Sequence, residues 1–533
     1  MSRVPEDHHD DLDSAHEQQD MLNSLATSKN ELRAWYSYSW SYDVFPLCAM
    51  GIFIPIFLEQ LARENSQSED GRSCRDLPSY VSCTVRVLWF QIQPVSFALY
   101  TASLSVLFQA LFIISMSGLA DHGSYRKRLL LGFGWCGGAA TLLFLLANIN
   151  FYFGPLLAIV GNVSFGVSSV CLNAYLVILV ANLEGGAHDM PPSTYSAASN
   201  IIIGPVTLGS EQAPNIASEA TLKVSSNISG KGTAAGFGGA IVLQLILIPI
   251  VAALGSTRFS TQVAISVCGL WWLVFSIPTV RWLKNRPGRA LDLERETTIF
   301  RYVLSSWIEL RNTARDAKSM YDVVIFLSAW FLLSDAMTTI NSCAVLFGKS
   351  ELNMSASALA VAGVLVTLSG VTGAYAWPSI IAKRLALSQV GIALLILASA
   401  LLVPLYVLCG FLPFLQQWGL GGVQTVGELY FVSITYGFIL GGMSTYFRSI
   451  FGVLVPPGRE SAFFALYAVT DKGSSVVGPA VVGAITDATG NIRYAFYFPA
   501  SMLLLAFFIL RKVDTERGRI NAIRISRSMT STG

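Results

Sequence analysis

The stretch Gly118-Leu119-Ala120-Asp121-His122-Gly123-Ser124-Tyr125-Arg126-Lys127-Arg128 joins two apolar runs, at about 95–119 and 128–149. Glycine permits helices to approach closely, and an aspartate can meet a helix N-terminal dipole or a cation. A basic cluster holds a short connection on the cytosolic side of a membrane. This stretch therefore predicts a cytosolic turn between two transmembrane helices. Contacts at such a turn would break and form when the two halves of the protein move relative to each other. We therefore interpret five residues as a conformational switch: Gly118, Asp121, Arg126, Lys127 and Arg128.

Apolar runs of spanning length continue on both sides of this turn. The chain has 533 residues, of which 53% are hydrophobic and 13% charged, and each crossing needs about 20 apolar residues. We expect an all-α integral membrane protein with twelve transmembrane helices. The twelve runs lie at about 34–60, 95–119, 128–149, 151–183, 233–254, 262–283, 320–346, 355–382, 386–410, 424–447, 461–485 and 492–511.

The connections divide these runs into two halves of six. If the N-terminus lies in the cytosol, 27 of the 35 Lys and Arg residues fall on the cytosolic side, which is the bias that sets orientation. The expected organisation is a disordered cytosolic tail (1–33), an N-terminal half (34–283) containing a flexible cytosolic loop (184–232), a charged cytosolic linker (284–319), a C-terminal half (320–511) and a basic cytosolic tail (512–533).

Polar residues recur on one face of the first helix of each expected three-helix repeat, where transporters line a central cavity. An ionisable group at the centre of a span costs about 2.5 to 3.5 kcal/mol, so it must face protein or water. Stripes of Ser, Thr and Gly alone are equally typical of helix packing. Lys472 either meets a substrate carboxylate or pairs with Asp471 or another acid. The candidates for substrate or proton binding are Tyr36, Asp43, Asn173, Asp335, Glu428 and Lys472.

Other residue patterns set further expectations. Cys74 and Cys83 share one polar connection, so they form a disulfide if that loop faces an oxidising lumen. Asn353-Met354-Ser355 is a glycosylation acceptor in a predicted luminal loop. Neither metal-ligand spacing nor a set of catalytic residues is present, and no basic cluster alternates with aromatics, so we expect no metal, no cofactor, no enzymatic activity and no nucleic-acid partner.

Several stretches resemble a known family. The turn at 118–128 is similar to the major facilitator signature, although the corresponding Gly370-Val371-Thr372-Gly373 in the second half lacks the acidic residue. Trp35-Tyr36-Ser37-Tyr38, Ser96-Phe97-Ala98-Leu99-Tyr100 and Ile228-Ser229-Gly230-Lys231-Gly232 resemble the fungal autophagy-related vacuolar amino-acid effluxers. Asp43 departs from that family, which usually has glutamate there.

This resemblance implies a multi-pass protein of the vacuole membrane that exports amino acids released by autophagic degradation from the lumen to the cytosol. Its partners would be amino acids, membrane lipid and, if transport is coupled, protons. Two alternatives stay open from the residues. One is a major facilitator transporter of another polar solute, such as a sugar, nucleoside or drug, and the other is a non-transporting scaffold or lipid-moving protein.

Overall fold

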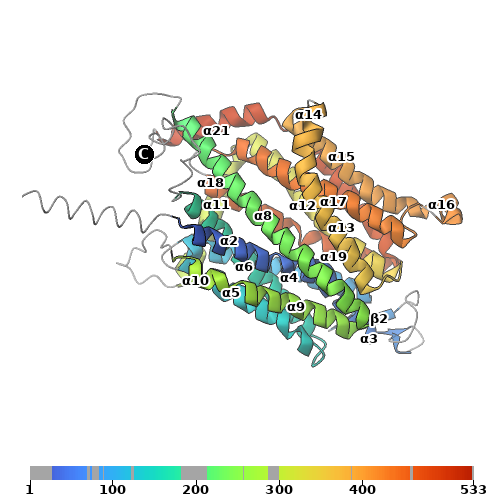
Figure 1. Cartoon of the computed structure of the whole chain (residues 1–533). Coiled ribbons are helices and arrows are strands. Elements are labelled where there is room, and N and C mark those ends of the chain that lie inside the picture. Colours follow the sequence, from blue (N-terminus) through green and yellow to red (C-terminus); the bar gives the residue numbers. More distant parts are fainter. Residues whose placement is uncertain are drawn as a thin grey trace, which may run out of the picture.

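The computed structural model describes residues 27–68, 72–74, 83–87, 89–121, 125–181, 213–255, 257–285, 299–385, 387–419, 421–456 and 460–530. These residues are almost entirely helical, and they also form one three-stranded sheet. The helices run side by side in two groups, with α8 crossing in front of both in the view shown (Figure 1).

The N-terminal half begins with a helix that Ser28 caps. Its hydroxyl accepts the backbone N–H of Glu31, whose carboxylate accepts the N–H of Ser28 in return, and this reciprocal pair fixes where the helix starts. The described helices of this half are α2 (Lys29–Tyr42), η1 (Phe45–Phe53), α3 (Ile54–Glu64), α4 (Pro94–Asp121), α5 (Tyr125–Leu142), η3 (Leu143–Leu146), α6 (Phe153–Ala181), α8 (Ala213–Ala253), α9 (Arg258–Phe275) and α10 (Ile277–Trp282).

Hydroxyl side chains also cap helices of the C-terminal half. Ser355, Ser388 and Thr425 each accept a backbone N–H in the first turn of the helix that follows. The described helices are α12 (Tyr321–Ser350), α13 (Ala356–Ala376), η4 (Trp377–Ile381), α14 (Ala382–Leu385), α15 (Gln389–Leu408), η5 (Cys409–Phe411), α16 (Pro413–Trp418), α17 (Val426–Leu454), α18 (Glu460–Ser474), α19 (Val477–Thr489), η6 (Ile492–Phe496) and α20 (Tyr497–Leu510).

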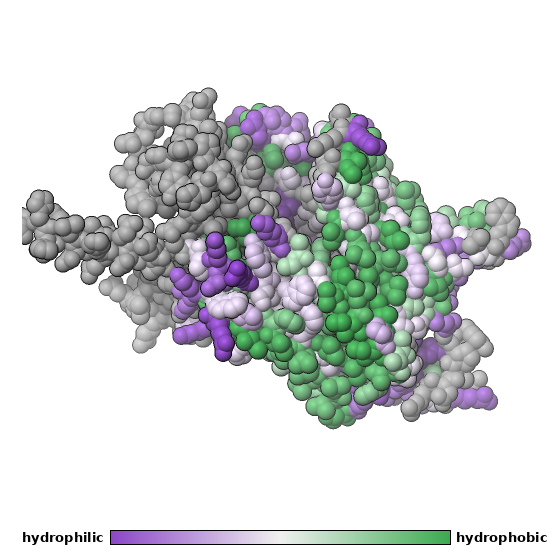
Figure 2. Space-filling model, in the orientation of Figure 1, coloured by the Kyte–Doolittle hydropathy of each residue, from purple (hydrophilic) through white to green (hydrophobic). Residues whose placement is uncertain are grey.

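Eleven helical segments of the described chain are long and apolar enough to cross a membrane. The run predicted at 461–485 forms two shorter helices instead, because α18 ends at Ser474 and α19 begins at Val477. Together α18 and α19 occupy the place of the predicted eleventh span. Apolar side chains cover the middle of the face in Figure 2, with polar residues toward its ends, as a surface in contact with lipid requires.

The regions outside the spans contain more structure than the sequence led us to expect. Helix α2 already begins at Lys29, within the predicted tail, and α8 begins at Ala213, inside the predicted loop 184–232. The linker contains α11 (Ile299–Lys318), and the C-terminal tail contains α21 (Thr515–Thr530). Hydropathy does not indicate these helices because their sequences are rich in polar and charged residues. Residues 1–26, 182–212 and 286–298 lie outside the described chain.

Helix α21 is attached to the C-terminal half by an ion pair. The guanidinium of Arg517 donates to both carboxylate oxygens of Asp322, at 2.8 and 2.6 Å, and the side chain of Asp322 is only 1% exposed. These hydrogen bonds raise the pKa of Arg517 above its ordinary value. The predicted tail is therefore partly ordered against α12.

The connection between α3 and α4 folds into a small antiparallel sheet, in the order β1 (Gln67–Ser68), β2 (Cys83–Val87), β3 (Phe90–Ile92). A disulfide joins Cys74 to Cys83, with their Cα atoms 6.3 Å apart. The sheet and the disulfide give this connection a defined shape at the end of the molecule opposite α21 (Figure 1).

Candidate transport site and the contacts between the halves

Asp43 lies where α2 ends and the π-helical segment η1 follows. Its side chain is half-buried and faces α8, where a Cβ added to Gly236 would lie only 1.8 Å from Asp43 Oδ2. No residue other than glycine leaves room for the carboxylate there. Single π turns are frequent at functional sites, and this one puts a carboxylate against a neighbouring helix in the middle of a span.

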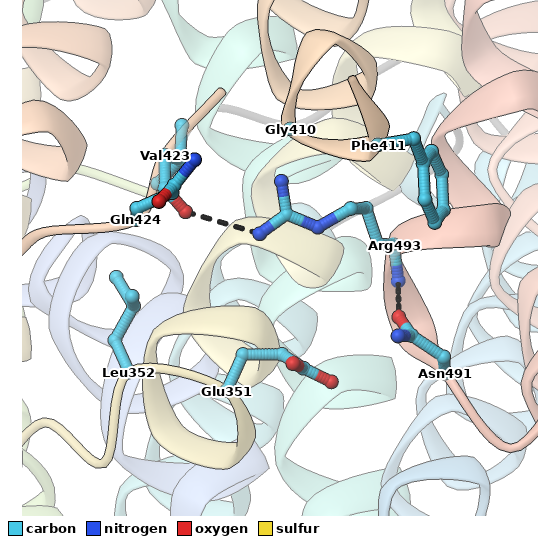
Figure 3. Close-up of a pocket in the computed structure, with 8 residues that line it drawn as sticks. All are labelled: Glu351, Leu352, Gly410, Phe411, Val423, Gln424, Asn491 and Arg493. Carbon is cyan, nitrogen blue, oxygen red and sulfur yellow. Dashed lines mark hydrogen bonds between the residues drawn. The ribbon is translucent and has the colours of Figure 1, made fainter. Parts of the chain in front are cut away.

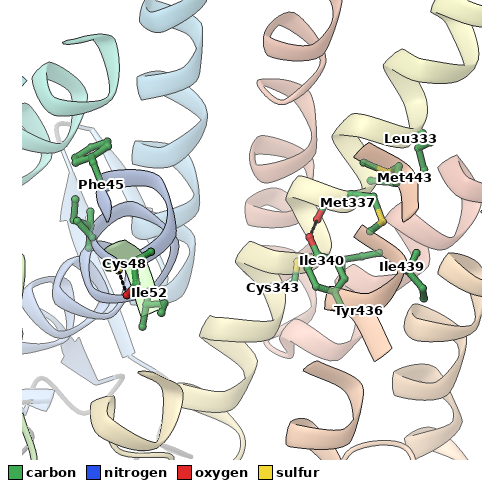
Figure 4. Close-up of a cluster of buried hydrophobic side chains, with 14 of the residues drawn as sticks. Phe45, Cys48, Ile52, Leu333, Met337, Ile340, Cys343, Tyr436, Ile439 and Met443 are labelled. Carbon is green, nitrogen blue, oxygen red and sulfur yellow. Dashed lines mark hydrogen bonds between the residues drawn. The ribbon is translucent and has the colours of Figure 1, made fainter. Parts of the chain in front are cut away.

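Helix α8 also packs along the part of the first span that comes after Asp43. Gln244 Nε2 donates to the carbonyl of Leu47 at 3.2 Å, and Cys48 Sγ contacts the carbonyl of Ala240 at 3.6 Å. Figure 4 shows Phe45, Cys48 and Ile52 on this segment and, in the other half, a cluster from α12 and α17 in which Tyr436 donates to the carbonyl of Met337 at 2.9 Å. The two groups belong to one buried hydrophobic cluster that contains residues of both halves.

Asp335 lies on α12 and is fully buried. Its Oδ1 accepts the backbone N–H of Gly478 at 2.9 Å, and a Cβ at Gly478 would lie 1.8 Å from Thr339 Oγ1. Gly478 is in the first turn of α19, where N–H groups lack partners within the helix. Asp335 thus caps the second of the two helices that replace the eleventh span.

Lys472 lies just before the break between α18 and α19. Its Nζ is 3.2 Å from Asp471 Oδ2, and its side chain is 40% exposed. Ser334 of α12 donates to Asp471 Oδ1 at 2.5 Å, and the hydroxyls of Thr338 and Ser475 are 3.3 Å apart. Of the two roles that the sequence left open for Lys472, the structure contains the pairing with Asp471, and it leaves much of the ammonium accessible.

The structure does not gather the remaining three candidates at these positions. Tyr36 is half-buried, with its ring edge-on to Trp35 at 5.6 Å between centroids, and Asn173 is exposed on α6. Glu428 accepts the backbone N–H groups of Gly421 and Gln424 at 2.6 and 2.7 Å. Glu428 therefore orders the connection before α17, which makes a place in the transport site the weaker interpretation of this residue.

The basic part of the predicted switch is bound within the N-terminal half. Lys127 Nζ donates to the carbonyls of Val280 and Leu283 at 3.0 and 2.5 Å. Arg126 is buried over the ring of Tyr175, 5.9 Å from its centroid, and Arg128 is exposed. Gly118 and Asp121 belong to α4, and their surroundings lie outside the described part of the structure.

A row of polar contacts between α4 and α19 joins the two halves, and the sequence analysis did not predict it. Asp487 Oδ1 accepts the backbone N–H of Gln93 at 2.8 Å, and Oδ2 accepts the hydroxyl of Tyr100 at 2.9 Å. Ser96 donates to the carbonyl of Gly483 at 3.1 Å, and Ser103 donates to that of Val476. The sequence feature that could have indicated this row is Asp487, an acidic residue in the short connection between two predicted spans. This row closes the halves together at the end that carries the disulfide.

A cavity of about 330 Å³ opens at that same end, within the C-terminal half. Arg493 lies across it and donates to the carbonyls of Val407 and Val423 at 3.0 and 3.2 Å, and its guanidinium is 6.0 Å from the ring of Phe411 (Figure 3). Arg493 of η6 thereby links α15 to the connection before α17. The cavity is lined by Glu351, Leu352, Gly410, Phe411, Val423, Gln424, Asn491 and Arg493.

The helical halves, the broken helix, the half-buried Asp43 and the buried Asp335 can now be set beside known proteins. Residues 27–523 match the family described as "Vacuole effluxer Atg22 like". The chain belongs to this family. It is similar to autophagy-related protein 22 of Neurospora crassa, at 40% identity over 92% of this chain and 72% of the relative. Autophagy-related protein 22-1 of Penicillium rubens is 41% identical over 94% of this chain and 93% of the relative.

Solved structures agree on the fold. A D-xylose-proton symporter superposes with a TM-score of 0.55 at 11% identity, covering 92% of this chain and 98% of its own. The nucleoside transporter NupG superposes with a TM-score of 0.52 at 11% identity, covering 91% of this chain and all of its own. The protein is therefore a transporter of the major facilitator fold from a vacuolar effluxer family, and it is not an enzyme.

Proposed function

We propose that this transporter exports amino acids from the vacuole lumen to the cytosol by alternating access, with residues 34–283 rocking against 320–511. The observation that carries the proposal is Asp43, a carboxylate at mid-span that the neighbouring helix accommodates only through Gly236. A transporter holds its substrate near the midplane, between its halves.

The charges suit a zwitterion. An amino acid carries an ammonium, which Asp43 of the N-terminal half can bind, and a carboxylate, which the accessible ammonium of Lys472 in the C-terminal half can bind. A substrate held from both halves stabilises the state in which they approach each other. The contacts between α4 and α19 join the halves at the end that carries the disulfide. In this proposal that end faces the lumen, and the contacts belong to a state that is closed to the lumen.

The test is radiolabelled amino-acid flux in proteoliposomes of defined orientation, with and without a proton gradient. Flux from the side of the disulfide-bonded sheet toward the side of α21 supports the proposal. If xylose or a nucleoside shows saturable flux and no amino acid does, the substrate is another polar solute and the proposal of amino acids is wrong.

Deleting residues 184–212 distinguishes a scaffold from a transporter. This deletion leaves α8 intact. A transporter keeps its flux without this stretch, whereas a scaffold whose soluble segments hold the activity loses its function while its spans stay folded. The deletion ends at 212 because α8 begins at Ala213.

A further inference from the structure

Helix α11 lies in the connection between the halves and contacts both of them. It packs against α4 of the N-terminal half and against α12 and α18 of the C-terminal half (Figure 1). Trp307 of α11 donates its indole N–H to the hydroxyl of Ser115 in α4 at 3.3 Å. The linker helix is thus fixed on the seam of the molecule.

A groove of about 570 Å³ separates α11 from α12 and α18, a volume typical of small-molecule sites. Its walls are mainly apolar. Ser328 is among the few polar residues, and its hydroxyl already donates to the carbonyl of Val324 at 2.8 Å. The lining residues are Ala314, Ala317, Lys318, Val324, Leu327, Ser328, Phe331, Leu332, Leu466 and Thr470.

The depth of the groove corresponds to one leaflet of a bilayer. Its α12 residues run from Val324 to Leu332, and α12 begins at Tyr321. At about 1.5 Å per residue, they lie roughly 5 to 16 Å from the end of the helix, and half of the hydrocarbon core is about 15 Å thick. An occupant of the groove would therefore lie among acyl chains.

The mouth of the groove is cationic. Lys318 lines it, and Arg311 and Arg315, at helical spacing from Lys318, are exposed on α11. Of the nearby acids, Asp322 is held by Arg517, and Asp316 is half-buried on α11. The excess of Lys and Arg assigns this side to the cytosol, where the leaflet carries anionic lipid.

We propose that this groove binds an anionic membrane phospholipid, with an acyl chain between α11, α12 and α18 and the phosphate on Lys318 and Arg315. Two independent features match such a lipid. The apolar walls reach the depth of an acyl chain, and the cations lie only at the mouth. Neutral lipid shares the first feature and lacks the second, whereas free phosphate shares the second and lacks the first.

The experiment is native mass spectrometry of the full chain released from nanodiscs that contain phosphatidylserine or phosphatidylcholine with identical acyl chains. We expect retained phosphatidylserine to exceed phosphatidylcholine by at least threefold, and excess inorganic phosphate not to displace it. Lys318→Gln should remove most of that preference. Arg384→Gln, which removes an exposed cation on α14, should leave it unchanged.

A second pair of variants tests the acyl-chain part of the site. Ser328→Trp fills the groove and should lower retained phosphatidylserine at least threefold. Ser501→Trp is the matched control, because Ser501 is likewise exposed on a spanning helix and donates to a carbonyl of its own helix. Equal retention of both lipids, or loss of lipid in Ser501→Trp as large as in Ser328→Trp, would overturn the proposal. So would displacement by phosphate, which would indicate an anion site alone.

Discussion

Asp43 of the first span and Gly236 of α8 are matched to each other: the carboxylate occupies the space that a Cβ at position 236 would need, 1.8 Å from Oδ2. The two residues are 193 positions apart in sequence, yet each limits what the other can be. The functional consequence of this pair can be tested from either side.

Asp43→Asn should reduce amino-acid flux at least tenfold, because the amide keeps the size of the side chain and loses the charge that binds an ammonium or a proton. Asp43→Glu, the residue usual in the resembled family, should keep much of the flux. The measurement is flux per folded molecule in proteoliposomes. If Asp43→Asn transports normally, the charge of Asp43 is not needed for transport and the residue serves only in packing.

Gly236→Ala should impair flux as much as Asp43→Asn does, since the added Cβ displaces the carboxylate. Gly238→Ala is the control two residues along the same helix, where the nearest atom to the new Cβ is a Trp40 side-chain carbon at 3.3 Å. Alanine favours helix over glycine by about 1 kcal/mol, so a loss of stability would not explain the result. Equal flux in both variants would contradict the assigned contact.

Asp335→Asn should keep a melting temperature close to that of the unmodified protein and most of the flux, because the amide oxygen can still accept the N–H of Gly478. Asp335→Ala leaves that N–H buried without an acceptor, which costs about 1 to 3 kcal/mol, so its melting temperature should fall. Thermal unfolding followed by tryptophan fluorescence gives the comparison. If Asp335→Asn unfolds normally and transports nothing, the charge takes part in transport and the capping role is incomplete.

Tyr100→Phe should open the luminal end more often, because it removes a hydrogen bond to a carboxylate that joins the halves. Such a bond contributes about 1.5 to 3 kcal/mol, so the closed state should lose roughly tenfold or more in relative population. Spin labels at exposed positions 149 and 488, in a Cys136→Ser background, report the distance between the luminal ends. Tyr152→Phe changes an exposed tyrosine of the same half and should leave the distribution unaltered.

Hydropathy alone predicts most of this fold, because lipid requires long apolar helices and the sequence contains twelve runs of that kind. The break at Ser475 was not predictable, since 461–485 is continuously apolar enough to read as one helix and the cap that stabilises the break comes from Asp335, over 140 residues away. The helices α11 and α21 were missed because a charged surface helix and a charged linker have the same composition.

The candidate site was predicted in part. Asp43 could be selected from a charge at mid-span, but Gly236 carried no signal, because its role arises only where α8 crosses the first span. Glu428 has the same helical spacing as a cavity residue, yet it binds two backbone N–H groups at the end of α17. Periodicity reports the face of a helix and not the depth at which a residue lies.

Asn353 should carry glycan on only a fraction of molecules, and Asn227 should carry none. Asn353 is exposed and has a φ of 50° at the turn after α12, while Ser355 of the same acceptor accepts the N–H of Ala358 and caps α13. An acceptor folded into a helix cap at the membrane edge is hard for a transferase to reach. Asn227 belongs to α8 and precedes its apolar segment Lys231–Ala253. An electrophoretic shift on glycosidase treatment, abolished by Asn353→Gln and unaffected by Asn227→Gln, is the expected result. Glycan on Asn227 would reverse the orientation, and with it the direction of transport that we propose.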